Sequence, residues 1–266
     1  AHASRHLIGG ADALNAMPYD ATSTNLLING GFYVWQRGTS QTVIGYGSDD
    51  KWGNSFSNST KTHSRQTFTV GQTDVPGNPI YYSRSVVTTS NAANALNVKY
   101  QNIEDVTRFS GKQVTVSFWA KADAAKNIAI EFLQQFGTGG STSVNGIGSQ
   151  KIALTTSWAK YTATVDIPSI AGKTVGTSSA FQLRFWFEAG SDYNARTDTL
   201  GNQSGTFDIA NVQLNYGSVA LPFVSNGYTE LLAQASRYVV IPTVATIYGR
   251  MVSYTANTIT FFVPTM

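Results

Sequence analysis

Apolar and polar residues alternate along most of the middle of the chain, which is the period of a half-buried β-strand. Residues 114–119, 128–132 and 161–167 each place their apolar side chains on one face. Two later segments do so more strongly, because nearly every residue of one face is large and apolar. Their apolar positions are Phe181, Leu183, Phe185 and Phe187, and then Phe207, Ile209, Val212 and Leu214.

The segments between these strands predict how the strands are joined. Residues 137–148 and 189–205 are rich in Gly, Ser, Thr and Asn, which is typical of loops. Many short strands with such loops predict an all-β fold, a two-sheet jelly-roll sandwich. We assign this domain to residues 25–226, beginning with an apolar strand at 25–32 that runs into a glycine turn.

The two ends of the chain differ from the middle. Residues 1–24 predict an extended N-terminal leader, since glycines and Pro18 interrupt any helical period. Residues 227–266 predict one short helix, Thr229–Tyr238 with Thr229 as its cap, and a small C-terminal β region with strands at 238–241 and 258–263. We expect this region to begin a distal tip domain that continues past Met266.

Composition narrows the classes of partner. Charged residues are 12% of the chain and the net charge is +3, so Ser, Thr, Asn, Gln and Gly must cover the surface, which suits neutral polar ligands. No cluster of Lys and Arg indicates nucleic acid, and no apolar run predicts membrane insertion. The absence of cysteine excludes a disulfide scaffold, a thiol nucleophile and a zinc knuckle.

One aromatic residue stands apart from the predicted core. Trp186 lies among polar side chains on the face opposite the phenylalanines, and an indole among hydrogen-bonding groups is what a sugar ring requires. Trp119 repeats the arrangement beside Thr115 and Ser117. The alternative is that this face packs on a neighbouring subunit or a covering loop. The predicted ligand-binding residues are Gln182, Arg184, Trp186, Glu188, Trp119 and Tyr193, with Arg196 extending the site.

A second group of aromatic and charged residues precedes the first long strands. We expect Trp35 and Trp52 to fill one end of the sandwich, with Arg37 paired to one of two adjacent carboxylates, Asp49 or Asp50. His63 stands beside Arg65 and is expected on the surface.

Catalytic patterns are sparse, so we predict that the protein is not an enzyme. The chain has three histidines and no serine in a Gly-x-Ser-x-Gly turn. Hydrolysis of a glycoside needs two carboxylates facing each other across the sugar. Glu188 with Asp192 or Asp198 is the one pairing that merits a test.

Several blocks resemble the receptor-binding domains of bacteriophage and prophage tail fibres or tailspikes. Residues 29–38, Asn-Gly-Gly-Phe-Tyr-Val-Trp-Gln-Arg-Gly, resemble the opening block of those domains, and Asp50-Lys51-Trp52 resembles the element that follows it. Residues 103–121 and 207–223 resemble the next block and the closing strand, and residues 230–238 resemble the helix after it. The likeness covers nearly the whole chain.

This resemblance implies a carbohydrate-binding-module-like jelly roll in a homotrimeric tail fibre of the virion, outside the cell but assembled in the host cytoplasm. Its partners would be a bacterial surface polysaccharide or lipopolysaccharide and other phage tail proteins, bound without catalysis. Two alternatives stay open, a structural connector that carries a separate receptor-binding tip and a polysaccharide-degrading tailspike. The resemblance implies no cofactor except a structural calcium with Asp208 as a ligand, and Tyr33 replaces a second acidic ligand.

Overall fold

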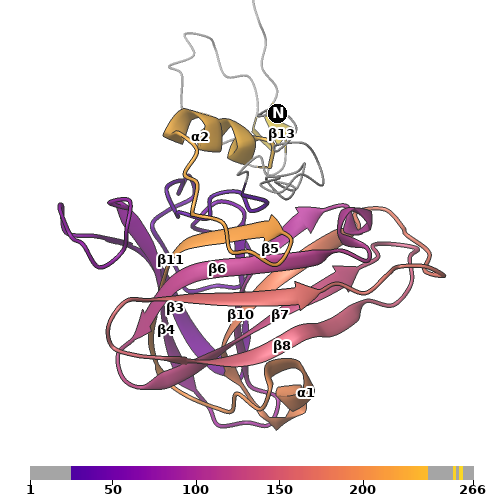
Figure 1. Ribbon diagram of the computed structural model, residues 1–266, viewed down its shortest axis with the longest axis horizontal. Helices are drawn as coiled ribbons and strands as arrows, with labels where there is room; N and C mark the ends of the chain where they lie inside the picture. Colours follow the sequence, from indigo (N-terminus) through magenta and orange to yellow (C-terminus); the bar gives the residue numbers. More distant parts are fainter. Residues whose placement is uncertain (1–24, 239–253, 256–257, 260–266) are drawn as a thin grey trace, which may run out of the picture.

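The computed structural model describes residues 25–238, 254–255 and 258–259, and two antiparallel sheets stack face to face in it (Figure 1). The six-stranded sheet has the order β1 (Ser40–Gln41), β3 (Ser59–Thr67), β4 (Tyr81–Thr89), β11 (Gly205–Tyr216), β6 (Gln113–Ala122) and β9 (Ala159–Asp166). The five-stranded sheet has the order β2 (Trp52–Ser57), β5 (Leu96–Glu104), β10 (Ala180–Ala189), β7 (Lys126–Gln135) and β8 (Val144–Leu154). The predicted jelly-roll sandwich is therefore confirmed.

The core lies between the two sheets, where the predicted apolar faces meet. Phe185 of β10 lies 5.0 Å from the ring of Phe118 in the other sheet and 6.2 Å from the ring of Trp52. All eight predicted apolar positions of β10 and β11 are buried in this cluster. The alternation of apolar and polar residues thus fixed which side of each strand faces inward.

A β-bulge interrupts β10 and changes the direction of one predicted site residue. The pairing with β5 shifts register between Trp186 and Glu188, so Glu188 lies opposite Asn97. Asn97 points between the sheets, where its Nδ2 donates to Ser59 Oγ of β3 at 2.9 Å. Glu188 consequently faces the sandwich interior, because a bulge adds one residue to the strand and turns the next side chain over.

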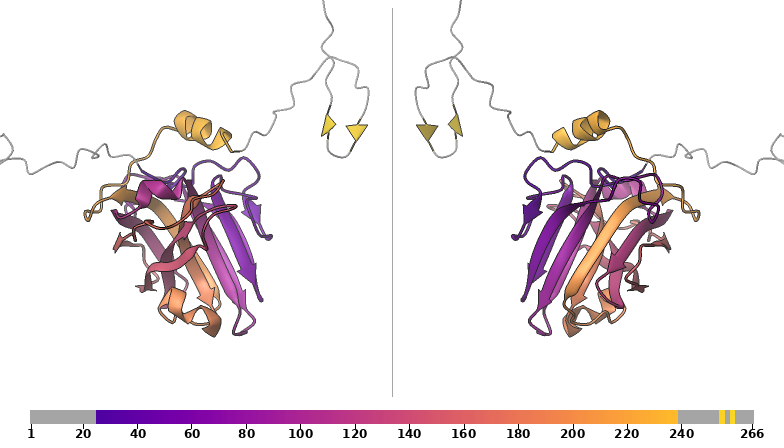
Figure 2. Two further views of the ribbon diagram at one scale, coloured as in Figure 1. Left: turned by 90° about the vertical axis from the view of Figure 1, so that its right-hand side faces the viewer. Right: turned by 90° about the vertical axis from the view of Figure 1, so that its left-hand side faces the viewer.

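The shorter elements lie at the ends of the sandwich. Two 3-10 helices, η2 (Val106–Phe109) and η3 (Ser191–Tyr193), and the short helix α1 (Asn194–Thr197) follow strands of the five-stranded sheet. Helix α2 (Tyr228–Ser236) packs Leu231 and Ala235 against Val34 and lies across the opposite end from α1 (Figure 2). The helix prediction is confirmed, but Gly227 precedes it and Thr229 lies inside it rather than capping it.

Two boundaries differ from the predictions. Residues 25–32 form turns instead of a strand, held to β11 by the bond from Leu26 N to Leu214 O. Strand β8 begins at Val144, inside the predicted loop 137–148. In the C-terminal region β12 (Tyr254–Thr255) pairs with β13 (Thr258–Ile259), while the rest of the predicted strands at 239–241 and 260–263, and the leader 1–24, lie outside the described residues. None of the helices within these ranges has the length and apolarity to cross a membrane.

Candidate functional site

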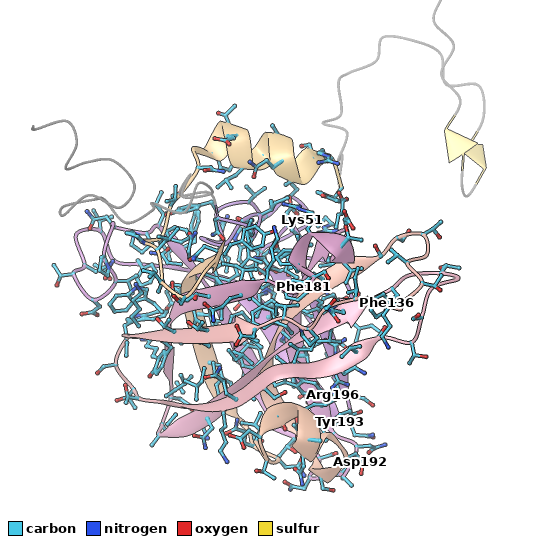
Figure 3. The ribbon with its side chains drawn as sticks, turned by 45° about the vertical axis from the view of Figure 1, so that its right-hand side comes forward. Lys51, Phe136, Phe181, Asp192, Tyr193 and Arg196 are labelled. Carbon is cyan, nitrogen blue, oxygen red and sulfur yellow. The ribbon has the colours of Figure 1, made fainter. Side chains whose placement is uncertain are left out.

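Trp186 is buried, so the prediction of a solvent-facing tryptophan platform is wrong. Only 1% of its surface is exposed, because the segment carrying η3 and α1 folds over this half of the five-stranded sheet (Figure 3). The ring of Tyr193 lies 5.2 Å from the indole, and the guanidinium of Arg196 lies 5.1 Å above it. The structure thus shows the alternative arrangement, in which a loop covers the face of the sheet that carries Trp186.

A fully buried carboxylate holds this covering segment in place. Glu131 of β7 accepts hydrogen bonds from Trp186 Nε1 at 3.0 Å and from the guanidinium of Arg196 at 2.5 Å. The backbone N–H of Gly146 donates to the same carboxylate at 2.9 Å. Charge-assisted bonds of this kind are strong in a dry environment. Trp186 and Arg196 therefore serve to anchor the loop.

Glu188 and Trp119 do not join Trp186 in a site, and the predicted pairs of carboxylates do not meet. Glu188 is buried in the sandwich interior, where burial raises the pKa of its carboxyl group. Asp192 and Asp198 are exposed on the outer loop, so the carboxylate pairing considered for hydrolysis does not form. Trp119 lies on the other sheet, half-buried in a cluster with Phe68 and Val75.

Asp208, the residue predicted to bind calcium, takes part in an ion pair. Its two carboxylate oxygens accept from Arg84 Nε and Nη2 at 2.8 Å each, and Lys121 Nζ lies 3.9 Å away. Among the residues that the structure describes, no group of three His, Cys, Asp or Glu side chains could hold a metal ion. Both carboxylate oxygens of Asp208 are therefore engaged by the bidentate contact with Arg84.

The uncovered half of the five-stranded sheet carries an aromatic surface that sequence reasoning missed. Tyr100 of β5 lies over Gly53 of β2, and a Cβ at that glycine would sit 2.4 Å from the tyrosine ring. Glycine at this position therefore lets the ring lie flat on the strand beside it. Tyr46 meets Tyr100 edge to face, with ring centroids 5.8 Å apart.

Polar side chains continue from these rings across the sheet. Asn102 donates to the Tyr46 hydroxyl at 3.2 Å and accepts from Gln182 Nε2 at 2.5 Å. Gln182 in turn accepts from Arg184 Nε. We call this set the tyrosine face: Tyr46, Tyr100, Asn102, Gln182 and Arg184. Two of the predicted residues, Gln182 and Arg184, therefore belong to it. Gln182 is only 2% exposed and holds Asn102 and Arg184 in place, whereas Arg184 is partly exposed.

A pocket of about 630 Å³ opens at one end of the tyrosine face and shares Tyr46 and Asn102 with it. Tyr238 forms another aromatic wall, with Lys51 Nζ 3.2 Å from its ring centroid. The remaining lining residues are Arg37, Glu104, Asp105, Ser178, Ser179 and Ala180. Aromatic faces beside amide, hydroxyl and charged groups are suited to binding a polyhydroxylated ligand.

Burial shifts the pKa values of two pocket residues. It raises the pKa of Tyr46 to about 12, with Tyr100 adding to the effect, and it lowers the pKa of Lys51 to about 8. The tyrosine hydroxyl accordingly remains a neutral donor near neutral pH, and Lys51 keeps a proton that it can lose in mild alkali.

The sequence carried one signal for the missed residues. Val98, Tyr100 and Asn102 alternate with Lys99 and Gln101, so Tyr100 shares a face with a polar residue. The side of that strand that faces inward also carries polar residues, Lys99 and Gln101. Because both sides are polar, the usual rule that the polar side faces solvent could not identify the outer side.

Comparisons with known proteins give distant structural similarity alone. No protein-family model matches the chain and no curated protein matches its sequence. Solved structures with a similar fold include the enzymatically active domain of bacteriophage CBA120 tailspike protein 4, with 16% identity and a TM-score of 0.43 over 72% of this chain. The chain spans only 21% of that tailspike's length.

Two further solved structures are matched over nearly their whole length. A family 4 carbohydrate-binding module shares 17% identity with a TM-score of 0.40, and the match covers 71% of this chain and 98% of the module. A cyclase from Fischerella sp. TAU shares 9% identity with a TM-score of 0.47, over 74% of this chain and 100% of the cyclase. These proteins differ in function, so a functional conclusion has to come from the residues of this chain.

Proposed function

We propose that this chain is a glycan-binding adhesin of a phage tail fibre, and that a bacterial surface polysaccharide or lipopolysaccharide occupies the tyrosine face and the adjoining pocket. The observation that carries the proposal is the flat ring of Tyr100 on the sheet, continuous through Tyr46 and Asn102 with the pocket. A pyranose ring stacks on such a surface while its hydroxyl groups pair with Asn102 and Arg184, which are partly exposed.

The state of the nearby carboxylates supports binding without catalysis. Glu131 is occupied by Trp186 and Arg196, as described above. Glu104 lies 3.6 Å from Arg237, and Asp105 accepts from the backbone of Thr107 to cap η2. A glycosidase needs one carboxylic acid and one carboxylate free to face each other across the substrate.

Assembly would convert weak binding into firm attachment. The sequence blocks 29–38 and 50–52 resemble those of trimeric tail fibres, and three copies of an open, shallow site can bind one polysaccharide together. In this proposal the chain is a homotrimer in the virion and contacts other phage tail proteins.

Calorimetric titration with purified surface polysaccharide from susceptible cells tests this function. We expect saturable binding by the wild type and a loss of about tenfold in affinity for Tyr100→Ala, which corresponds to about 1.4 kcal/mol of lost stacking. Tyr228→Ala is the matched control, because Tyr228 is 60% exposed on α2 and its loss should leave affinity unchanged.

Three results would contradict the proposal. Equal binding by wild type and Tyr100→Ala would place the glycan elsewhere, and no binding by either protein would favour a structural connector. Release of reducing sugar during the titration would instead indicate a polysaccharide-degrading enzyme.

A further inference from the structure

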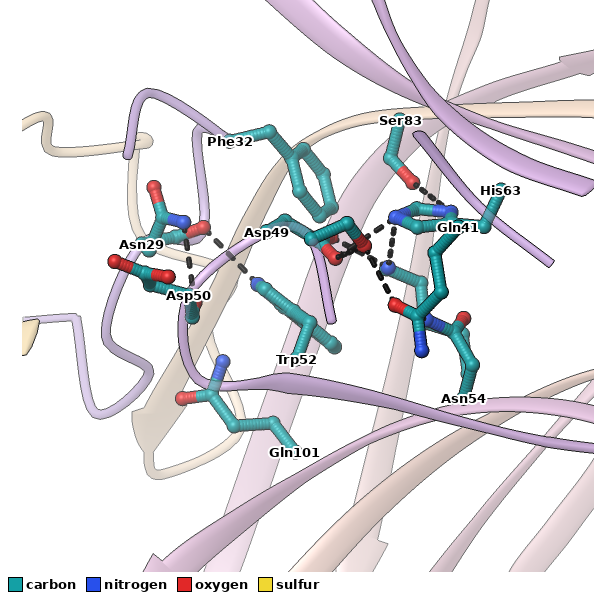
Figure 4. A network of polar contacts seen from close by, with 12 residues as sticks. Asn29, Phe32, Gln41, Asp49, Asp50, Trp52, Asn54, His63, Ser83 and Gln101 are labelled. Atoms are coloured by element: carbon teal, nitrogen blue, oxygen red, sulfur yellow. Dashed lines mark hydrogen bonds and ion pairs between the residues drawn. The ribbon is translucent and has the colours of Figure 1, made fainter. Parts of the chain in front are cut away.

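The sandwich interior contains a lysine, a carboxylate and a histidine in mutual contact (Figure 4). Asp49 precedes β2, Lys99 comes from β5, and His63 comes from β3 in the opposite sheet. Their exposed fractions are 0%, 0% and 1%. Charged groups are rarely buried this completely, because removal from water costs several kcal/mol for each ion.

The lysine amine lies against the carboxyl group in an unusual way. Lys99 Nζ is 2.5 Å from Asp49 Oδ2, yet this oxygen has no partner in hydrogen-bonding geometry. The other oxygen, Oδ1, lies 2.7 Å from His63 Nε2 and accepts from Ser48 Oγ at 3.1 Å. The amine is therefore in contact with the carboxyl group without forming a directed hydrogen bond to it.

The imidazole of His63 contacts both the lysine amine and the carboxyl group. His63 Nε2 lies 3.1 Å from Lys99 Nζ as well as 2.7 Å from Asp49 Oδ1. On its other side, Nδ1 lies 3.5 Å from Ser83 Oγ. Nε2 thus lies between the amine and the carboxyl oxygen, within hydrogen-bonding distance of both, which is the position that a proton shuttle requires.

Aromatic rings surround these groups. Lys99 Nζ lies 5.5 Å from the ring centroids of both Phe32 and Trp52, and Trp35 stacks on His63 at 5.4 Å. Burial lowers the pKa of the Lys99 amine. A dry, aromatic environment favours the neutral amine, which is the nucleophilic form.

We propose that Lys99 and Asp49 are joined by an intramolecular isopeptide bond that forms in the folded chain. The Nζ–Cγ bond forms, one Cγ–O bond of the carboxyl group breaks, and one water molecule leaves. An ammonium and a carboxylate give an amide and water, so atoms and charge balance without a co-reactant. Two protons leave Nζ in this step: the first passes to the carboxylate, which gives the neutral amine and the carboxylic acid, and the second reaches the departing oxygen as the Nζ–Cγ bond forms, so that the oxygen leaves as water. His63 carries the second proton from Nζ to that oxygen, which makes it a catalytic residue of this step.

The bond would link the segment before β2 to the middle of β5 and close a loop of the chain within the sandwich. Such a crosslink restricts the unfolded chain as a disulfide does, in a protein that has no cysteine. This inference does not depend on glycan binding.

The mass of the intact, denatured wild-type chain tests the proposal directly. We expect it to be lower than the mass calculated from the sequence by one water molecule. Trypsin does not cleave after an amidated lysine, so a branched peptide should join residues 38–51 to residues 85–108. Fragmentation should place the branch at Asp49 and Lys99.

Variants identify the reacting groups. Lys99→Met should have its full calculated mass, whereas Lys61→Met, which removes a second buried lysine whose Nζ donates to the Val98 carbonyl at 3.2 Å, should still lack one water. His63→Gln should show the full mass in freshly refolded protein and lose water more slowly than the wild type. A wild-type chain of full mass, with trypsin cleavage after Lys99, overturns the proposal and leaves a buried ion pair.

Discussion

Successive residues of β5 show two opposite uses of polar chemistry. Lys99 points into the sandwich and contacts Asp49 and His63, whereas Tyr100 points outward and lies over Gly53. The interior residues are fully buried and contact one another, while Tyr100 and Arg184 remain partly exposed. The inner residues can affect folding strongly, and the outer residues can reach a ligand.

This contrast predicts that substitutions in the interior and on the tyrosine face affect different measured quantities. Substitutions in the interior should change the free energy of unfolding and leave the glycan affinity of folded molecules unchanged. Substitutions on the tyrosine face should do the reverse.

Asp49→Ala should reduce the free energy of unfolding by about 3–5 kcal/mol, because it removes the crosslink and leaves the Lys99 amine buried without a partner. Denaturant unfolding followed by tryptophan fluorescence measures the loss. Asp192→Ala is the control, since Asp192 is exposed and its removal should change stability by less than about 0.5 kcal/mol. Equal stability of Asp49→Ala and the control would mean that the interior cluster contributes little.

Trp186→Ala should also destabilise the protein, by about 3 kcal/mol, because the indole fills the space beneath the covering segment. Its effect on glycan affinity should be smaller than that of Tyr100→Ala. Unfolding and titration of the same protein measure both quantities. Unchanged stability with abolished binding would restore Trp186 as the stacking residue.

Acid should weaken the sandwich through His63. Burial lowers its pKa to about 4 while Asp49 and Lys99 are free, with Asp49 acting to raise it and Lys99 and Lys61 acting to lower it. In the crosslinked protein Asp49 and Lys99 are uncharged, and burial still lowers the pKa of His63. Its ordinary pKa is about 6.5, so the unfolded chain takes up a proton first as pH falls. Stability should be greatest above pH of about 6.5 and decline from there toward about 4.

Urea unfolding midpoints at pH of about 7.5 and about 5 measure this decline. His63→Gln should show a smaller difference between the two midpoints than the wild type. The same difference in both proteins would assign the pH dependence to other groups.

Tyr46→Phe should have the smallest effect. It keeps the ring beside Tyr100 and removes the hydroxyl that accepts from Asn102. A lost hydrogen bond of about 0.5–1.5 kcal/mol corresponds to a loss of roughly twofold to tenfold in glycan affinity. Titration at two salt concentrations checks it, and an affinity equal to that of the wild type would remove the hydroxyl from the site.

The sequence predicted the fold better than the site, and β10 shows why. Its alternation correctly placed Phe181, Leu183, Phe185 and Phe187 in the core, because period-two patterns depend on local geometry alone. The same pattern put Glu188 on the outer face, where a one-residue bulge later in the strand reversed it. A bulge at this position leaves no signal in the pattern of apolar residues.

The site depends on contacts between residues far apart in the chain. Trp186 is covered by a segment that Glu131 anchors through Arg196, 65 positions from it in the chain. His63 was expected on the surface and is buried between Asp49 and Lys99. The pairing of Arg37 with Asp50, at 3.6 Å, was foreseen because both residues lie near one another in sequence.

Hydroxyl-radical footprinting with and without the surface polysaccharide tests the central claim most directly, because it reports the accessibility of individual side chains. Oxidation of Tyr46 and Tyr100 should fall when the glycan is bound, while oxidation of Tyr228 should stay the same. Bound polysaccharide with unchanged oxidation of both Tyr46 and Tyr100 would contradict it.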